Sequence, residues 1–334
     1  MSRPGRLSRW AGAAGLGPLV LLLAACGPQA SEVSDPPPDP VAHPVVAVGQ
    51  AGSVLDAVES ALRTPVPAKD AGAQDGRLLG PFRELARADA RIAAERKTAV
   101  AAPAKVNRLR LIVPTTKSWP RFFVAVGNAS TSSTPVLRVL TSPTPRTPYG
   151  LWAEPVMLPG TTLPDTAPAL TGSGLVAPDA SGLVGTPKEV LSGFAGYLNQ
   201  GATSAASKEF RRSTYSDQLL QRLAADRKAL KAVATVTSKH TVGSPEPFAV
   251  RTTDGGALVI GELQQEYVIT VKKGKGAVDV TDKDLAALAG GQKKIKKSLT
   301  RTAVEIVVLH VPPRGKGEVT VIAAQKGDVK AVIT

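Results

Sequence analysis

The chain has 334 residues, a formal net charge of +14 at pH 7, three histidines and one cysteine. A single cysteine cannot form an intramolecular disulfide, so the fold has to be held by its core. One cysteine and three scattered histidines also cannot supply a metal site built from those ligands, and the sequence predicts no metal ion and no cofactor.

Residues 1–25 have the three parts of an export signal: arginines, an apolar run from 11 to 23, and small residues. The run is too short to span a bilayer core, which needs about 20 apolar residues. It ends in Leu23-Ala24-Ala25-Cys26, which resembles the lipobox of a bacterial lipoprotein. The resemblance implies cleavage before Cys26 and a thioether-linked diacylglycerol on that cysteine. The alternative is an ordinary cleaved signal followed by a chance cysteine.

Residues 26–50 are rich in proline, serine and aspartate, a composition that cannot bury a core. We interpret them as a tether, which could reach roughly 80 Å when fully extended. Together with the resemblance to a lipobox, the tether predicts an exported protein. Its folded part would be held at the outer face of the cell membrane through the lipidated Cys26.

The later elements follow from periodicity and from start and stop signals. Apolar stripes predict helices over 53–64, 81–97, 187–200 and 216–232, the third of them starting at the capping box Thr186-Pro187-Lys188-Glu189. Alternation predicts strands over 108–113, 121–126, 136–140, 149–158, 233–242, 248–253, 257–271, 303–311, 318–324 and 329–334. Asp254-Gly255 predicts a tight hairpin, and we expect the long strand 257–271 to bend or bulge near residue 264.

Helices followed by strands occur twice, at an offset of about 135 residues, which indicates an internal duplication. The arrangement resembles two tandem α+β domains of the nuclear transport factor 2-like (NTF2-like, cystatin-like) type, over 51–161 and 187–334, with a linker at 162–186. The whole arrangement, with the segments 149–152, 158–160 and 311–313, also resembles uncharacterised two-domain actinobacterial lipoproteins. The first resemblance implies a helix-covered, curved antiparallel sheet in each half, with a pocket that can hold a ligand or nothing.

Basic residues gather in the second half of the chain. The clusters predict an anion-binding patch of Lys272, Lys273, Lys275, Lys293, Lys294, Lys296, Lys297 and Arg301. Its partner outside a cell membrane would be an anionic lipid or a phosphate-bearing wall polymer. Nucleic acid is not expected, because aromatic residues are not interleaved with these lysines. The alternative is a solvated surface that keeps the protein in solution.

Four aromatic residues of the first half could line a pocket, although core packing explains them as well: Trp119, Phe122, Tyr149 and Trp152. Glu262 and Glu266 share one face of the long strand, so they could act as an acid–base pair or as solvent-facing charges. The sequence contains none of the common hydrolase or nucleotide-binding motifs.

The leading hypothesis is a non-enzymatic, membrane-anchored lipoprotein that binds an envelope protein, a lipid or a wall component. The first alternative is a carrier or chaperone for a lipid or small molecule in a sheet pocket. The weaker alternative is a cryptic hydrolase or isomerase that uses Glu262 or Glu266.

Overall fold

The computed structural model describes residues 42–63, 76–100, 106–130 and 132–334. Cys26 and most of the expected tether lie outside the described residues, so both stay predictions. Residues 41–334 form one compact unit. Within the described ranges, no helix is long and apolar enough to cross a membrane.

The described chain contains helices on both sides of a large sheet. The α-helices are α1 (Val48–Arg63), α2 (Gly80–Arg96), α3 (Pro187–Gln200), α4 (Thr214–Leu230) and α5 (Lys283–Leu288), and short 3₁₀ turns cover Gly201–Thr203 and Ala205–Glu209. The strands are β1 (Val106–Ile112), β2 (Pro114–Thr115), β3 (Arg121–Ala129), β4 (Pro135–Ser142), β5 (Gly150–Ala153), β6 (Val156–Met157), β7 (Ser173–Gly174), β8 (Ala234–Val242), β9 (Phe248–Arg251), β10 (Ala257–Val271), β11 (Val278–Asp279), β12 (Lys294–Ile295), β13 (Ser298–Val311) and β14 (Thr320–Ile333).

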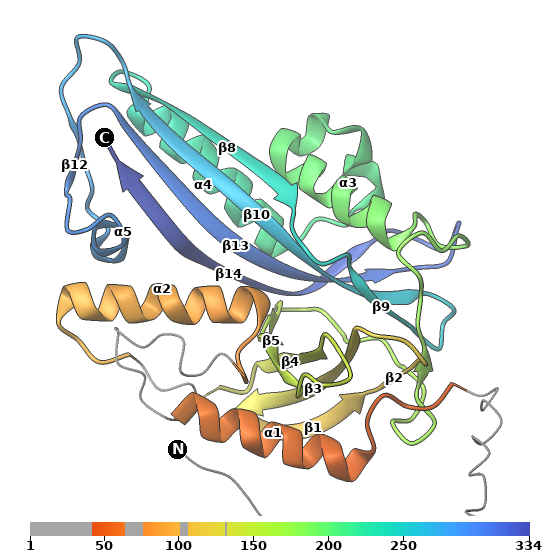
Figure 1. The fold of residues 1–334 in the computed structure, drawn as a ribbon. Coiled ribbons are helices and arrows are strands. Elements are labelled where there is room, and N and C mark those ends of the chain that lie inside the picture. The colour runs from red at the N-terminus through yellow and green to blue at the C-terminus, as the bar shows by residue number, and fades with distance from the viewer. Residues whose placement is uncertain (1–41, 64–75, 101–105, 131) are drawn as a thin grey trace, which may run out of the picture. The chain divides into compact units, whose positions relative to one another are not determined.

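Ten of these strands form one antiparallel sheet in the order β1-β3-β4-β6-β14-β13-β10-β8, with β5 beside β4 and β9 beside β10 (Figure 1). The two-residue strand β6 joins the halves, because it pairs with β4 on one side and with β14 on the other. The two sheets expected from the duplication are therefore one sheet. The expected α+β class with a large antiparallel sheet is confirmed.

Apolar side chains fill both faces of this sheet. On the outer face of the N-terminal strands, Leu55 of α1 belongs to the same buried cluster as Phe123. The inner face packs against the C-terminal strands, where the Phe122 and Phe248 rings lie 4.9 Å apart. Phe194 of α3 is fully buried against the other face of the C-terminal strands. The halves consequently share a core as well as a sheet.

The strongest local signals of the sequence are confirmed. At the start of α3, the Thr186 hydroxyl accepts a hydrogen bond from the Glu189 backbone N–H at 3.2 Å. The Glu189 carboxylate accepts one in return from the Thr186 N–H at 3.0 Å, which completes the capping box. The hairpin between β9 and β10 turns at Gly255, whose φ of +84° suits glycine.

Three strand predictions are wrong. The expected strand 149–158 is two short strands, β5 and β6. The segments 318–324 and 329–334 are one continuous strand, β14. Gly327 does not interrupt it, and its missing side chain makes room for α2, because a Cβ there would lie 2.5 Å from Leu85 Cδ2. The expected bulge in β10 is absent opposite β13, because the two strands keep their register over the whole length of β10, and the irregularities lie between β13 and β14 instead.

Residues 162–186, expected as a linker, bond to both halves. The Ser173 N–H donates to Val113 O at 2.9 Å, and the Val176 N–H donates to Ala249 O at 3.0 Å. Further along, the Val184 N–H donates to Pro312 O. This segment ties the halves together, and the domain boundaries at 51–161, 162–186 and 187–334 stay predictions.

A buried arginine fixes α1 to the N-terminal strands. Arg138 on β4 is 2% exposed, and its guanidinium lies 2.8 Å from a carboxylate oxygen of Glu59 on α1. Its Nε also lies 2.6 Å from a carboxylate oxygen of Glu154. The Glu154 backbone N–H donates to the side chain of Gln325 on β14, so the network reaches the C-terminal strands.

Candidate functional site

The two segments that carry the predicted lysines, the loop after β10 and the residues around β12, lie at the same end of the C-terminal strands as the C-terminus (Figure 1). We name as the lysine end the exposed side chains of Lys272, Lys273, Lys275, Lys293, Lys294, Lys296 and Lys297. The Val271 N–H donates to Lys297 O at 2.8 Å, and the Lys297 N–H donates to Thr334 O at 2.7 Å. These backbone bonds hold the two lysine-bearing segments side by side.

Arg301, also predicted for this patch, lies differently. Its guanidinium is 4.3 Å from the centroid of the Tyr267 ring, and its Nε lies 3.5 Å from a carboxylate oxygen of Asp328. A side chain that is stacked and paired in this way is not part of the exposed patch. The end of α4 adds a basic neighbour that the sequence did not suggest, because Lys272 Nζ donates to Lys231 O at 2.5 Å.

A group of polar side chains, four of them ionisable, lies inside the C-terminal half and is here called the buried polar cluster: Tyr215, His240, Gln265, Glu305 and Lys326. Glu305 has an exposed fraction of 0%, and its Oε1 accepts a hydrogen bond from Lys326 Nζ. His240 Nε2 lies 3.4 Å from the same oxygen. Burial alone would raise the pKa of the Glu305 carboxyl, but the contact with His240 and the charge of Lys326 outweigh burial and lower the pKa to about 2.

Residues of α3 and α4 cover the buried polar cluster. The Asn199 side chain of α3 donates to His240 O at 2.9 Å and accepts from the His240 N–H at 2.6 Å, which covers the edge of β8. Burial and the charge of Glu305 raise the pKa of Tyr215 on α4. The cluster was not predicted, because each member is an isolated polar residue on a different element and only the strand register brings the members together.

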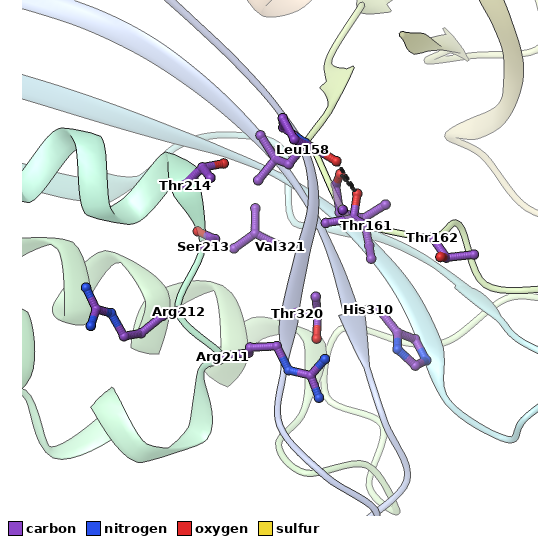
Figure 2. Close-up of a pocket in the computed structure, with 13 residues that line it drawn as sticks. Leu158, Thr161, Thr162, Arg211, Arg212, Ser213, Thr214, His310, Thr320 and Val321 are labelled. Carbon is purple, nitrogen blue, oxygen red and sulfur yellow. Dashed lines mark hydrogen bonds between the residues drawn. The ribbon is translucent and has the colours of Figure 1, made fainter.

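A pocket of about 380 Å³ lies beside the first residues of β14 (Figure 2). Two segments form its walls, and they are held by β14 and by Val319, the residue before it. The Leu158 N–H donates to Ile322 O at 2.8 Å, and the Arg211 N–H donates to Val319 O at 2.9 Å. Because backbone bonds fix both walls, the pocket is part of the folded structure and does not depend on side-chain positions alone.

The lining of the pocket is polar and basic. It consists of Leu158, Pro159, Gly160, Thr161, Thr162, Arg211, Arg212, Ser213, Thr214, His310, Thr320, Val321 and Ile322. His310 Nε2 lies 2.9 Å from Asp254 Oδ2. No group of three or more His, Cys, Asp or Glu side chains in the described part of the chain is placed to hold a metal ion.

The aromatic residues predicted to line a pocket do not share one. Phe122 and Trp152 are 2% and 4% exposed and both contact the Phe248 ring, so they belong to the core between the halves. The Tyr149 ring packs against the ring of Phe123, in the core under α1, and its hydroxyl donates a hydrogen bond to Val45 O. Trp119 is exposed and stacks under the Arg121 guanidinium at 3.7 Å. Core packing, the alternative interpretation, fits the first three.

The paired-carboxylate hypothesis is not supported by the geometry. Glu266 is exposed, as the solvent-facing alternative expected, but Glu262 is only 4% exposed. The two lie four residues apart on a regular strand, roughly 13 Å, so they cannot share a proton. Gly243 makes room for the buried carboxyl, since a Cβ there would lie 2.6 Å from Glu262 Oε1.

A family model for a domain of unknown function, DUF8094, matches residues 42–332. The chain belongs to the DUF8094 family. The match includes both halves and the segment between them, which agrees with the single sheet. It carries no named activity and does not reach Cys26. No curated protein and no solved structure matches the chain.

In this DUF8094 domain, burial and the nearby charge of Glu84 raise the pKa of Glu262 to about 7, against the effect of a hydrogen bond from Gln264. The folded state therefore holds this proton more tightly than the unfolded state, and the resulting stability is lost as the pH rises from about 4.5 to about 7. Glu262→Gln should raise the free energy of unfolding by about 2 kcal/mol at about pH 8 and change it little at about pH 5.

Urea unfolding followed by circular dichroism at the two pH values measures this difference. Glu266→Gln is the matched control, because it removes the same charge from an exposed position on the same face of the same strand. If the two variants gave the same stability at both pH values, the burial of Glu262 would not be coupled to its ionisation.

Proposed function

We propose that the protein is a non-enzymatic lipoprotein of the cell envelope that is anchored through Cys26 and lies against anionic lipid headgroups with its lysine end. The anchor supplies the location, at the outer face of the cell membrane. The lysine end supplies the orientation of the folded unit, so that other surfaces are presented to envelope partners.

The observation that carries this proposal is the convergence of the lysines. Residues 271–297 contain eight Lys and three Asp, so the segment has an excess of five positive charges. Of the three aspartates, Asp284 is paired with Arg96 at 2.5 Å, and Asp279 lies across from Lys294 in the β11–β12 pair. In the sequence, the lysines of residues 272–275 and 293–297 are two separate clusters. The backbone bonds of Lys297 to Val271 and Thr334 place them next to each other, so we treat them as one surface.

Charge complementarity favours a lipid surface as the partner. A lysine close to an anionic bilayer contributes about 1 kcal/mol, and the attraction falls off within a Debye length of about 10 Å. Several lysines on one end can approach a plane together, whereas scattered lysines cannot. A tether of roughly 80 Å would leave the lysine end free to reach the membrane that holds Cys26.

Charge removal at the lysine end tests the proposal on the unit formed by residues 41–334, which carries no lipid. The variant replaces four lysines by glutamine: Lys293, Lys294, Lys296 and Lys297. We expect its affinity for vesicles of phosphatidylglycerol and phosphatidylcholine in equal amounts to fall by about 100-fold or more, in cosedimentation at low salt.

The control variant replaces four exposed basic residues elsewhere by glutamine: Lys188, Lys208, Arg251 and Lys316. It changes the net charge by the same amount and should keep most of the affinity. Equal losses in both variants would mean that net charge, and not the lysine end, attracts the unit. Binding to a purified phosphate-bearing wall polymer but not to vesicles would assign the lysine end to the polymer and contradict the lipid proposal.

The finer fold proposal is that each half is an NTF2-like unit. It is supported by the order of elements, since α1 and α3 each begin a half and α2 and α4 each precede its main strands. The carrier alternative requires a cavity against the sheet. Both sheet faces are filled with buried side chains in the described residues, so the polar pocket at β14 is the better place for a small ligand.

A further inference from the structure

The pocket beside β14 is separate from the lysine end. His310 and Thr320, which line the pocket, face each other across β13 and β14, whereas the lysine end adjoins the opposite end of β13 at Ser298. Along the strand this separation is roughly 40 Å. An inference about the pocket therefore does not depend on the proposed membrane surface.

The charge of the lining is one-sided. It contains two arginines and a histidine and no Asp or Glu. Arg212 is held by Asp217, with Nη2 to Oδ2 at 3.0 Å. Arg211 is held only loosely, because the nearest Glu318 oxygen is 3.8 Å away and the two side chains are 66% and 50% exposed. In Figure 2, Arg211 and Arg212 extend to different sides, and Arg211 lies beside Thr320.

Threonine hydroxyls also line the pocket. The Thr161 hydroxyl is used within the wall, where it donates to Leu158 O at 2.7 Å (Figure 2). The hydroxyls of Thr162, Thr214 and Thr320 make no hydrogen bond within the ranges that the structure describes, so they can donate to a ligand. Thr214 is the first residue of α4, a helix of 17 residues, and the positive end of the helix dipole adds to the charge of Arg211.

From this geometry we propose that the pocket binds a small ligand that carries a phosphate group. Arg211 is the charged contact, because a guanidinium donates two parallel hydrogen bonds to phosphate oxygens. The free threonine hydroxyls bind the remaining oxygens. A volume of about 380 Å³ has room for a phosphate and a few carbon atoms beyond it, so a small phosphate monoester fits and a bare phosphate leaves space.

Isothermal titration of the unit 41–334 at low salt tests this proposal, with inorganic phosphate and glycerol 3-phosphate as probes. Glycerol 3-phosphate should bind saturably and at least as tightly as inorganic phosphate. Arg211→Gln should weaken its binding about tenfold or more, the loss expected for a charge-assisted contact, and Arg211→Lys should keep part of the affinity. The folding of an exposed-arginine variant is checked by circular dichroism.

Arg222→Gln is the control, because Arg222 is an exposed arginine that pairs with a carboxylate on α4 outside the pocket. It should bind glycerol 3-phosphate as the unchanged unit does, and so should the variant with four glutamines at the lysine end. Three results would overturn the proposal: no saturable binding of either probe, equal affinity in the Arg211→Gln and Arg222→Gln variants, or succinate binding as tightly as glycerol 3-phosphate.

Discussion

Glu305→Gln should lower the free energy of unfolding by about 3 kcal/mol at neutral pH, the range found when one member of a buried ion pair is removed. The substitution keeps the shape of the side chain and removes its charge. Lys326, whose Nζ donates to Glu305 Oε1, would then remain half-buried without its nearest counter-ion, and His240 would lose the charged group 3.4 Å from its Nε2. Urea unfolding of the unit 41–334 measures the change.

The pH dependence gives this prediction a second readout. The pKa of Glu305 is lowered to about 2 in the folded state, so its ionisation stabilises the fold above about pH 4.5, and this stability is lost as the pH falls toward about 2. The difference in the free energy of unfolding between Glu305→Gln and the unchanged unit should therefore shrink at about pH 3.

A double variant, Glu305→Leu with Lys326→Met, should recover much of the lost stability, because it removes both charges of the pair together. A difference that stays constant with pH would contradict this role for the carboxylate.

Cys26→Ala should release nearly all of the protein from the membrane fraction of cells. One acyl chain gives a partition constant of only about 10⁴ M⁻¹, but the two chains of a diacylglyceryl cysteine anchor a protein stably, and the variant would have neither. The lysine end alone should not replace the anchor, because its attraction is screened by salt. Fractionation at low and high salt, with immunodetection, measures the distribution.

Mass spectrometry of the membrane-bound protein provides the matching control for this prediction. The unchanged chain should begin at Cys26 and carry the mass of a diacylglyceryl group. A Cys26→Ala protein that stayed in the membrane at high salt would contradict the lipobox prediction. An unchanged chain without the mass of a diacylglyceryl group would support the alternative of an ordinary cleaved signal.

The parts of the fold that the sequence predicts well depend on neighbouring residues. The capping box at Thr186 and the turn at Asp254-Gly255 act within a few residues, and both occur where expected. The continuity of the sheet depends on β6, which is two residues long and pairs across more than 160 positions of the chain. Periodicity cannot reveal a pairing of that kind, because two residues carry no period.

The candidate sites also combine features that are visible locally in the sequence with contacts between distant segments that are not. The lysines were visible as charge clusters, but their union depends on backbone bonds between Val271, Lys297 and Thr334. The phosphate pocket combines the segments around Thr161, Arg211 and Thr320, none of which has a phosphate-binding motif. Glu262 was misjudged because the alternation of β10 indicates a solvent face, whereas residues 257–263 of β10 are buried on both faces, and Leu258 and Ile260 there pack in a core with the other half of the chain. Burial by a distant segment leaves no local sequence signal.

The most direct test of the central claim is hydrogen–deuterium exchange of the unit 41–334 with and without vesicles that contain phosphatidylglycerol. The account predicts slower exchange at residues 271–276 and 293–297 when vesicles are present, and the same rates elsewhere. The slowing should disappear at high salt, where the attraction between lysines and lipid headgroups is screened. Protection confined to any other surface, or no protection at low salt, would contradict the proposal that the lysine end lies on the membrane.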